Sequence, residues 1–260
     1  MLLTVDIGNT NIKVGAWDGG ELIFVSSMRT DIRSTPDEYA IKLLDVFRMR
    51  DYNSSQFDGA ILASVVPPLS GIMTRAVKTV LQIDRVYLAD AAMSGMKIAI
   101  DNPAQLGADL VCAAAAVVSK TPLPCLFVNL GTATTVFAID GDGCISGGAI
   151  SPGIGISLEA LSTKTAQLPH ISLEDPGSLI GKNTVDSMKS GVVYGTSAML
   201  DGLVGRFREE LSGGLSTDIC VVASGGFARS IIPHCREKIT IDDNIVLEGL
   251  KIIYERINHK

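Results

Sequence analysis

The sequence predicts a mixed α/β protein built from two similar lobes with a cleft between them. A hairpin motif occurs twice, first over residues 4–20 and again over residues 128–143. Each copy has an apolar run, an acid or amide, a glycine beside small polar residues, a second apolar run and a Gly-rich turn. Strand and helix patterns then follow both copies in the same order, and such a repeat is a stronger indication of fold than any single element. Hydrophobic residues make up 47% of the chain and charged residues 19%, so a sizeable core is possible.

The first half begins with three short strands joined by tight turns, of which Asp18-Gly19-Gly20 is the clearest. A helix follows, because Thr35 can cap its start, Pro36 suits its first turn and apolar residues recur at helical spacing. A continuous apolar strand then stops at Pro67-Pro68. The expected elements are strands over 2–6, 11–17 and 21–28, a helix over 35–48, a strand over 59–66, a helix over 72–81, a strand over 86–88 and an alanine-rich helix over 106–119.

The second half opens at Leu126 and repeats the pattern of the first hairpin. A buried strand that ends before Ser224 takes the place of the strand over 61–66 in the first half. No linker rich in proline or serine separates the halves, so we expect an N-terminal lobe over 1–119 and a C-terminal lobe over 120–260. The expected elements are strands over 126–130, 134–139 and 144–149, a helix through 158–161 after Pro152-Gly153, a helix over 187–210, a strand over 219–223 and a helix over 246–257.

Charge and composition exclude several classes of protein. The net charge is −6, so no excess of basic residues is present to release counterions from a nucleic acid. The start lacks the basic and long apolar segments of a signal peptide, and the longest apolar run, residues 111–118, is too short to span a bilayer. The 5 cysteines are widely spaced and the 3 histidines form no metal-ligand spacing. We therefore expect a cytoplasmic protein with reduced thiols and with no nucleic-acid or membrane partner.

The Gly-rich loops of the two hairpins are candidate phosphate sites. Gly8-Asn9-Thr10 and Gly131-Thr132-Ala133-Thr134 can direct backbone N–H groups and small hydroxyls at phosphates, and Lys13 adds a cation nearby. Either loop alone can be an ordinary hairpin turn, but matched positions in a repeat favour a nucleotide that is gripped from two sides. The chain has neither a P-loop nor a Rossmann fingerprint.

The two hairpins differ in charge at one aligned position. Asp6 aligns with Asn129 and Gly8 aligns with Gly131, so one hairpin offers a carboxylate and the other a neutral amide. Asp6, at the end of a strand, can hold a hydrated Mg²⁺ or orient water near phosphates. Its alternative role is to cap the turn.

Two further polar residues stand at the starts of expected helices. Asp109 follows Gly107-Ala108, where the helix dipole favours its ionised form, and its alternative role is that of an ordinary helix-start carboxylate. Thr184, in Gly181-Lys182-Asn183-Thr184, is a candidate helix cap, and its alternative role is to contact a ligand.

An ordered set of short motifs carries a resemblance to a known family. The motifs are Asp6-Ile7-Gly8-Asn9-Thr10-Asn11, Asn102-Pro103-Ala104-Gln105-Leu106-Gly107-Ala108-Asp109, Gly131-Thr132-Ala133-Thr134-Thr135, Gly148-Ala149-Ile150-Ser151-Pro152-Gly153, Asn183-Thr184, Ser190-Gly191, Ser224-Gly225-Gly226 and Leu247-Glu248-Gly249-Leu250. In this order they resemble type III pantothenate kinases over the full length of the chain. That family belongs to the acetate and sugar kinase, Hsp70 and actin superfamily. The resemblance therefore implies a duplicated RNase H-like (actin-like ATPase) fold with two lobes around a central cleft.

The resemblance also implies an activity, namely ATP-dependent phosphorylation of pantothenate to 4'-phosphopantothenate, the first step of coenzyme A biosynthesis. It implies that Asp109 is the general base, that Thr184 contacts the substrate across a homodimer interface, and that Asn129 lies where a monovalent cation, K⁺ or NH₄⁺, is bound. The implied contacts to ATP are Asp6 (through Mg²⁺ and water), Ile7, Gly8, Asn9, Thr10, Asn11, Ile12, Lys13, Gly131 and Thr132, and those to the substrate are Gly107, Ala108, Asp109, Leu110 and Thr184.

The chain departs from the family pattern at four positions. Leu110 stands where an Arg usually helps to hold the carboxylate of pantothenate, and Leu cannot form that pair. Ile100 replaces a usual Tyr, and Gln105 replaces a common Glu. Asn129 replaces a usual Asp, so the affinity for a monovalent cation is expected to fall. Two alternatives stay open: a diverged kinase that acts on another small molecule, and a nucleotide-binding regulatory protein without catalysis.

Overall fold

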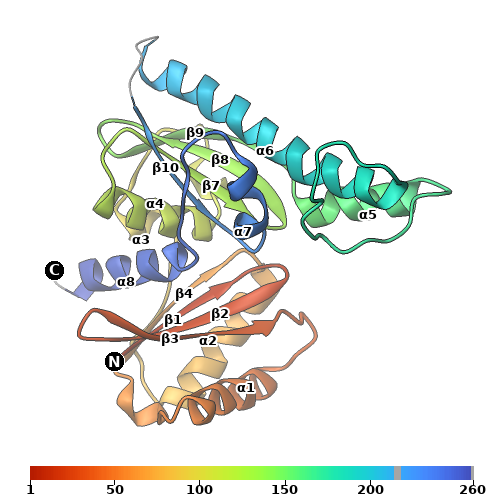
Figure 1. The fold of residues 1–260 in the computed structure, drawn as a ribbon. Coiled ribbons are helices and arrows are strands. Elements are labelled where there is room, and N and C mark those ends of the chain that lie inside the picture. The colour runs from red at the N-terminus through yellow and green to blue at the C-terminus, as the bar shows by residue number, and fades with distance from the viewer. Residues whose placement is uncertain (214–217, 259–260) are drawn as a thin grey trace. The chain divides into compact units, whose positions relative to one another are not determined.

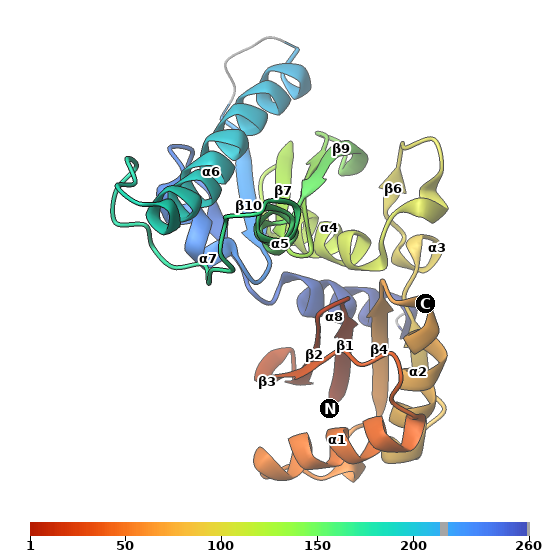
Figure 2. The same ribbon diagram turned by 90° about the vertical axis from the view of Figure 1, so that its right-hand side faces the viewer.

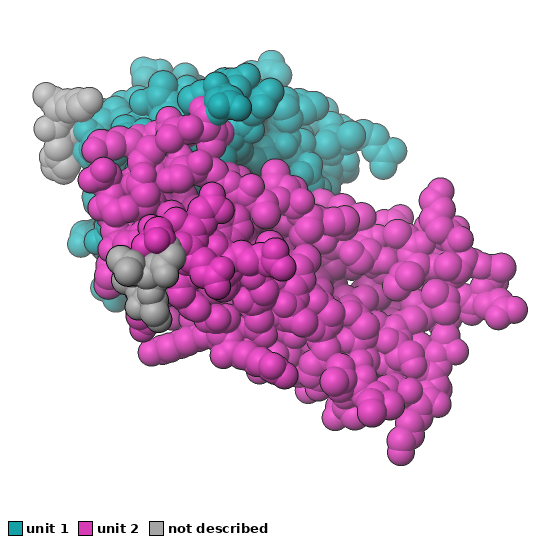
Figure 3. Space-filling model, turned by 90° about the horizontal axis from the view of Figure 1, so that it is seen from above, with its two compact units in different colours: residues 1–96, 101–119, 245–260 teal, residues 97–100, 120–244 magenta. Residues whose placement is uncertain are grey.

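The computed structural model describes residues 1–213 and 218–258, and the chain forms two compact units (Figure 1). Unit 1 consists of residues 1–96, 101–119 and 245–260, and unit 2 consists of residues 97–100 and 120–244, as coloured in Figure 3. The expected division between residues 119 and 120 coincides with one point at which the chain passes from one unit to the other. Residues 245–260 were expected in the second lobe but belong to unit 1, because the last helix packs on the first sheet. Residues 97–100 belong to unit 2, because a short strand there pairs with the second sheet.

A five-stranded sheet forms the centre of unit 1 (Figure 2). In order across the sheet, the strands are β3 (Glu21–Arg29), β2 (Asn11–Asp18), β1 (Leu2–Ile7), β4 (Gly59–Ser64) and β5 (Val86–Leu88). β1 pairs antiparallel with β2 and parallel with β4. It is buried along nearly its whole length, which explains why its sequence is a continuous apolar run before Asp6.

Helices cover both faces of this sheet. α1 (Pro36–Met49) and α2 (Pro67–Leu81) pack on the face that carries Leu3, Val5 and Ile7. α8 (Ile245–Asn258) packs on the opposite face, which carries Leu2, Ile61 and Ala63, and buried residues of α4 (Ala108–Lys120) belong to the same core. The side chains of β1 alternate between these two cores, as the period of a strand requires.

Local sequence accounts for the starts of the two helices on the first face. α1 begins with a capping box, in which Thr35 and Glu38 each accept a hydrogen bond from the other's backbone N–H. α2 begins at Pro67, five residues before its expected start at residue 72. Pro67 and Pro68 therefore open the helix as well as ending β4, because the first turn of a helix leaves its N–H groups unpaired in any case.

A six-stranded sheet forms the centre of unit 2. In order across the sheet, the strands are β11 (Thr240–Ile241), β10 (Cys220–Ser224), β7 (Cys125–Leu130), β8 (Ala133–Ile139), β9 (Cys144–Pro152) and β6 (Lys97–Ile98). The core of the unit lies between this sheet and three helices, α5 (Ile154–Lys164), α6 (Thr184–Leu211) and α7 (Ala228–Ile231).

The two sheets share one plan. Each begins with a three-stranded antiparallel meander, and a later strand then pairs parallel with the first strand of that meander, β4 with β1 and β10 with β7. The predicted duplicated α/β fold is therefore confirmed. The sequence did not predict the short elements, which have too few residues to show a period: β6, β11, α3 (Ala91–Ser94), α7 and the 3₁₀ turns η1 (Ser54–Gln56), η2 (Pro103–Gln105) and η3 (Ile232–His234).

Two general features of the chain are the apolarity of its helices and the state of its cysteines. Among residues 1–213 and 218–258, no helix combines the length and the apolar character that crossing a bilayer requires. All five cysteines are free thiols. Cys112 is fully buried, and burial raises the pKa of its thiol well above the ordinary value.

Candidate active site

Backbone hydrogen bonds hold the loop of the first hairpin. The Gly8 N–H donates to the Asn11 carbonyl (3.0 Å), and the Thr30 N–H donates to the Thr10 carbonyl (3.0 Å). The Thr30 hydroxyl donates to the Gly8 carbonyl at 2.6 Å. A Cβ on Gly8 would lie 3.0 Å from the Asn11 carbonyl oxygen, so this turn favours glycine. Asn9 and Thr10 are exposed at the tip, where their polar groups can meet a ligand.

The strands that carry this loop direct its charged residues to one side. Ile7 and Ile12 pair across the hairpin, and both are buried in the core with α1 and α2. Asp6 and Lys13 are the next pair, and side chains alternate along a strand. Asp6 and Lys13 therefore face the side of the sheet on which α4 and α8 pack.

Two carboxylates with raised pKa values lie at this end of β1. Burial raises the pKa of Asp6 to about 7, the charge of Asp109 raises it too, and Lys13 acts in the opposite direction. Asp109 lies in the first turn of α4, and burial raises the pKa of its carboxyl, against the hydrogen bond that the Leu110 N–H donates to Oδ1 at 2.8 Å. Two acids with raised pKa values in one place are typical of a functional site. This favours a chemical role for Asp109 over that of an ordinary helix-start carboxylate.

The neighbours of Asp109 leave little free space around its carboxylate. A Cβ on Gly107 would lie 2.5 Å from Asp109 Oδ1 and 3.4 Å from Val65 Cγ1, so only glycine leaves room for the carboxylate there. Leu110 is half-buried at the next position of α4. Cys112 lies one turn after Asp109, and the charges of Asp6 and Asp109 add to the rise in its pKa. These groups form one compact acidic cluster in unit 1.

In unit 2, two glycines from other segments, Gly153 and Gly225, lie directly against the loop of the second hairpin, and we call them the glycine cradle. A Cβ on Gly153 would lie 2.1 Å from the Thr132 carbonyl oxygen and 2.6 Å from that of Gly131. A Cβ on Gly225, whose φ is +106°, would lie 2.4 Å from the Leu130 carbonyl oxygen. Two separate segments therefore approach the loop through bare backbone, as in phosphate sites where N–H groups must come close to the ligand.

A neutral polar row crosses the second sheet beside this loop. Asn129 pairs antiparallel with Thr135 and parallel with Ser224, so the three side chains share one face of the sheet. Thr135 is buried, and its hydroxyl has no hydrogen-bond partner among the residues that the structure describes. The same is true of the hydroxyl of Thr134, on the opposite face. A buried hydroxyl without a protein partner marks a place where a ligand or water completes the structure.

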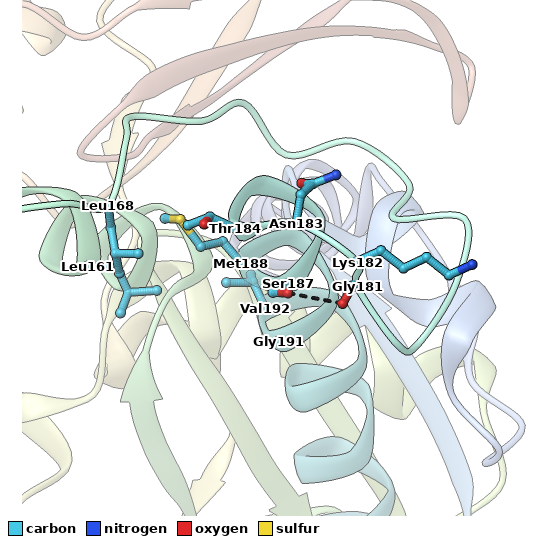
Figure 4. Close-up of a pocket in the computed structure, with 10 residues that line it drawn as sticks. All are labelled: Leu161, Leu168, Gly181, Lys182, Asn183, Thr184, Ser187, Met188, Gly191 and Val192. Atoms are coloured by element: carbon cyan, nitrogen blue, oxygen red, sulfur yellow. Dashed lines mark hydrogen bonds between the residues drawn. The ribbon is translucent and has the colours of Figure 1, made fainter.

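Thr184 lies elsewhere in unit 2, at the edge of a cavity of about 630 Å³ (Figure 4). The candidate role of Thr184 as the cap of its helix is wrong: Asn183 caps α6 by accepting a hydrogen bond from the Asp186 N–H (2.9 Å), and Thr184 is the first helical residue. The Thr184 side chain is exposed and remains free to contact a ligand. The cavity has apolar walls from α5 and α6 and a polar rim. Its lining residues are Leu161, Leu168, Gly181, Lys182, Asn183, Thr184, Ser187, Met188, Gly191 and Val192.

Each unit by itself carries groups that fit part of a nucleotide bound with Mg²⁺. Unit 1 offers the carboxylate of Asp6, and Mg²⁺ in proteins is commonly held by one or two carboxylates together with waters and substrate phosphates. Unit 2 offers the glycine cradle and the unpartnered hydroxyl of Thr135. Within residues 1–213 and 218–258, no group of three or more His, Cys, Asp or Glu side chains is placed to hold a metal ion.

Comparison of the sequence with known proteins identifies the family. A profile of the family described as type III pantothenate kinase matches residues 2–206. The chain belongs to this family. A type III pantothenate kinase from Syntrophus aciditrophicus is 37% identical over 256 residues, covering 98% of this chain and 99% of the relative. One from Exiguobacterium sp. is 38% identical with the same coverage, so the likeness extends over the whole chain.

Solved structures agree with the fold. A protein described as a Baf family transcriptional activator from Campylobacter jejuni has a TM-score of 0.63 at 16% identity, covering 99% of this chain and 100% of that one. A protein described as a 2-dehydro-3-deoxygalactonokinase from Sinorhizobium meliloti has a TM-score of 0.58 at 12% identity, covering 99% of both chains. At these identities the likeness concerns the fold alone, which is the duplicated two-lobe fold of sugar kinases and actin-like ATPases.

Three features of the site were not expected from the sequence. The first is that the charge of Asp109, about a hundred residues further along the chain, raises the pKa of Asp6. The second is Cys112, which lies beside both of them and whose residue type carried no signal. The third is the cavity beside Thr184, whose apolar walls have the pattern of an ordinary helix core.

Proposed function

We propose that this chain transfers the γ-phosphoryl group of ATP to the primary hydroxyl of pantothenate, giving 4'-phosphopantothenate for coenzyme A biosynthesis. The relatives that it matches over its full length are named for this reaction. The observation that carries the proposal is the carboxylate pair in unit 1, where Asp109 has a raised pKa beside Asp6 at the end of the first hairpin strand. A kinase of this kind needs a base for the attacking hydroxyl and a charge that attracts the metal of its nucleotide.

Asp109 is the proposed general base. Its carboxylate accepts the proton of the substrate hydroxyl as the hydroxyl oxygen forms a bond to phosphorus and the bond to the ADP oxygen breaks. A raised pKa improves a carboxylate as a base near neutral pH, because the proton is then held more tightly as it arrives. Gly107 leaves room for the Asp109 carboxylate, and Ala108 and Leu110 flank it at the start of α4. We assign these three positions to the substrate side of the site.

Asp6 and the hairpin loops are the proposed nucleotide site. Bound Mg-ATP supplies the phosphoryl group and neutralises part of its negative charge. Asp6 attracts the Mg²⁺ through water, and Lys13 limits the rise of the Asp6 pKa, so that more of the carboxylate is charged near neutral pH. The remaining proposed contacts come from the two loops and their flanking strands. They are Ile7, Gly8, Asn9, Thr10, Asn11, Ile12, Gly131 and Thr132.

Thr184 is proposed to contact the substrate bound to a second copy of the chain in a homodimer. Its side chain is exposed on unit 2, at the start of α6, and the surface beside it is apolar. Leu179 and Ile180 are 65% and 79% exposed just before α6, and Leu161 on α5 is 36% exposed. Large apolar side chains exposed together in this way mark a surface that another molecule covers.

The neutral second hairpin supports a further part of the proposal. Asn129 keeps an oxygen that can contact K⁺ or NH₄⁺, but it lacks the charge that a carboxylate would add. We therefore propose that any monovalent cation binds weakly and that the enzyme works with little dependence on it. We also propose that the protein acts in the cytoplasm, where its proposed cosubstrate ATP is available.

A direct assay tests the proposed function. Purified protein is incubated with ATP, Mg²⁺ and pantothenate, with and without added K⁺ or NH₄⁺, and 4'-phosphopantothenate is measured. Formation of the product is the expected result, and no turnover under any of these conditions overturns the proposal. ATP binding without transfer to pantothenate or a related alcohol would favour a regulatory protein. Transfer to a different alcohol would favour a diverged kinase.

A further inference from the structure

Helices α4 and α8 of unit 1 touch each other through bare backbone at one glycine. A Cβ built on Gly249 of α8 would lie 1.8 Å from the Cys112 carbonyl oxygen, 2.4 Å from its carbonyl carbon and 3.0 Å from its Cα. Buried residues of both helices belong to one core on the same side of the first sheet, and Figures 1 and 2 show α8 beside α4. Carbon–oxygen contacts lie at about 3.3 Å, so any side chain at Gly249 would force the two helices apart by roughly 1.5 Å.

This contact lies one helical turn from Asp109. Cys112 is three residues after Asp109 on α4, and Cys112 is itself fully buried against β4 and α8. Neither helix has room to give way sideways. Ala115 of α4 and Leu250 and Ile253 of α8 are buried in the same core, so a separation at Gly249 moves at least one helix as a rigid body.

The two carboxylates of the site are carried by different elements. Asp6 is on β1, whose position is fixed by hydrogen bonds to β2 and β4. Asp109 is on α4, whose distance from α8 is limited by the contact at Gly249, and α8 in turn packs on that sheet. A shift of α4 therefore changes the position of Asp109 relative to Asp6, whereas the nucleotide loop of the first hairpin stays in place.

We propose that Gly249 is a positioning residue for the reaction: its missing side chain lets α8 seat against α4 and so fixes where the Asp109 carboxylate lies. The proposal rests on the proposed role of Asp109 as the base. A misplacement of a reacting group by about 1 Å can lower a rate by a factor of 100. Gly249→Ala is therefore expected to lower kcat by about 10- to 100-fold, with the KM for ATP changed by less than about twofold, because the ATP loop is on β1 and β2.

The chain offers a matched control for this variant. Gly71 lies in α2, on the other face of the same sheet, and a Cβ there would have no neighbour within 4 Å. Gly71→Ala makes the same change in a helix and is expected to leave kcat unchanged. Ile253→Ala opens a cavity in the core around α8 and tests whether lower stability alone reduces kcat. A fall in kcat that Ile253→Ala reproduces at equal loss of stability, or no fall for Gly249→Ala, overturns the proposal.

Two further measurements keep the outcome decisive. If Gly249→Ala does not fold, Cys112→Val overpacks the buried core that α4 and α8 share and so displaces α4 in another way, with Cys112→Ala as its control. An unchanged kcat for Cys112→Val overturns the proposal. A comparison of crystal structures of Gly249→Ala and the parent gives a test that does not depend on kinase activity. They are expected to show the Asp109 carboxylate displaced from Asp6 by about 1 Å, and an unmoved carboxylate overturns the proposal. A parent protein without kinase activity would instead contradict the proposed function and leave this structural comparison intact.

Discussion

The two hairpins have the same place in the two sheets, but the rows of side chains beside their loops differ in charge. In the first sheet, the row across β2, β1 and β4 is Lys13, Asp6 and Ala63. In the second, the corresponding row across β8, β7 and β10 is Thr135, Asn129 and Ser224. An acidic and a basic side chain in one unit are thus replaced by neutral hydrogen-bonding groups in the other. The duplication supplied two Gly-rich loops, and only the first has charged side chains in the row beside it.

The environment of each row agrees with this division. Asp6 has a second acid beside it, Asp109, and its pKa is raised to about 7. Asn129 has a buried hydroxyl beside it, Thr135, that lacks a partner in the described part of the chain. A row that titrates near neutral pH can attract a metal and respond to a nearby base. A neutral row can only donate and accept hydrogen bonds.

The largest expected effect comes from removing the acid that only unit 1 has. Asp109→Asn keeps the shape of the side chain and an oxygen for the Leu110 N–H, but it cannot accept the substrate proton. We expect kcat to fall by about 10³- to 10⁴-fold while ATP binding, measured by calorimetry, is retained. Asp45→Asn, on the exposed side of α1, is the control. Full activity of Asp109→Asn would remove Asp109 from the role of base.

The next effect comes from making the first row resemble the second. Asp6→Asn should lower kcat/KM for Mg-ATP by about 100-fold, because the carboxylate that attracts Mg²⁺ is lost. The same variant should be more stable than the parent at pH 8. Asp18→Asn, in the exposed turn of the same hairpin, is the control for both measurements.

The stability effect follows from the sign of the pKa shift. The pKa of Asp6 is raised from 3.8 to about 7 in the folded protein, so the folded state holds a proton that the unfolded state releases between these values. Stability is therefore lost as the pH rises through about 7. At pH 8, urea unfolding without nucleotide should give Asp6→Asn a gain of about 1–3 kcal/mol, allowing for partial contact of the carboxylate with water. A loss of stability at pH 8 would contradict the raised pKa.

The pH dependence of the parent distinguishes the rows in one experiment. The proposed mechanism requires the charged forms of Asp6 and Asp109, and the pKa of each carboxyl is raised. We expect kcat/KM to fall about tenfold per pH unit below about 7. The row in the second sheet has no titrating group and should add no step. In Asp6→Asn, the acid limb of the residual activity should move to lower pH, and an unmoved limb would assign it to another group.

The smallest expected effect comes from charging the neutral row. Asn129→Asp places a carboxylate opposite Thr135, where the first hairpin has a lysine. We expect activity to become stimulated several-fold by K⁺ or NH₄⁺ relative to Na⁺, and stability to fall by about 1–3 kcal/mol because the half-buried charge lacks a partner of opposite sign. Strong stimulation of the parent by K⁺ would show that Asn129 suffices as a cation ligand.

Much of the fold could be read from the sequence because its signals are local. The hairpins are marked by alternating strands and Gly-rich turns, and their repetition predicted two similar sheets. The last helix could not be assigned to a unit in the same way. The pattern over residues 246–257 predicts an apolar face, but it does not say which sheet that face meets, and in the structure Leu247 and Leu250 pack in unit 1.

The site was predictable only in part, for the same reason. The Gly8 and Gly131 loops have local signals, whereas Asp109 gained its role from the family resemblance. Its influence on Asp6 depends on where α4 packs on the first sheet, and no spacing along the chain records that. Gly249 was visible only as a member of a motif, because its close contact with Cys112 joins residues that are far apart in the sequence.

Product analysis with the parent protein tests the central claim most directly, because that claim is phosphoryl transfer that depends on Asp6 of the first hairpin and Asp109 of α4. The protein is incubated with ATP, Mg²⁺ and pantothenate at pH 8, without K⁺ or NH₄⁺, and the phosphorus-containing products are followed by NMR. The predicted result is equal formation of ADP and a pantothenate phosphomonoester. Release of ADP with inorganic phosphate, or no consumption of ATP even after K⁺ is added, would contradict it.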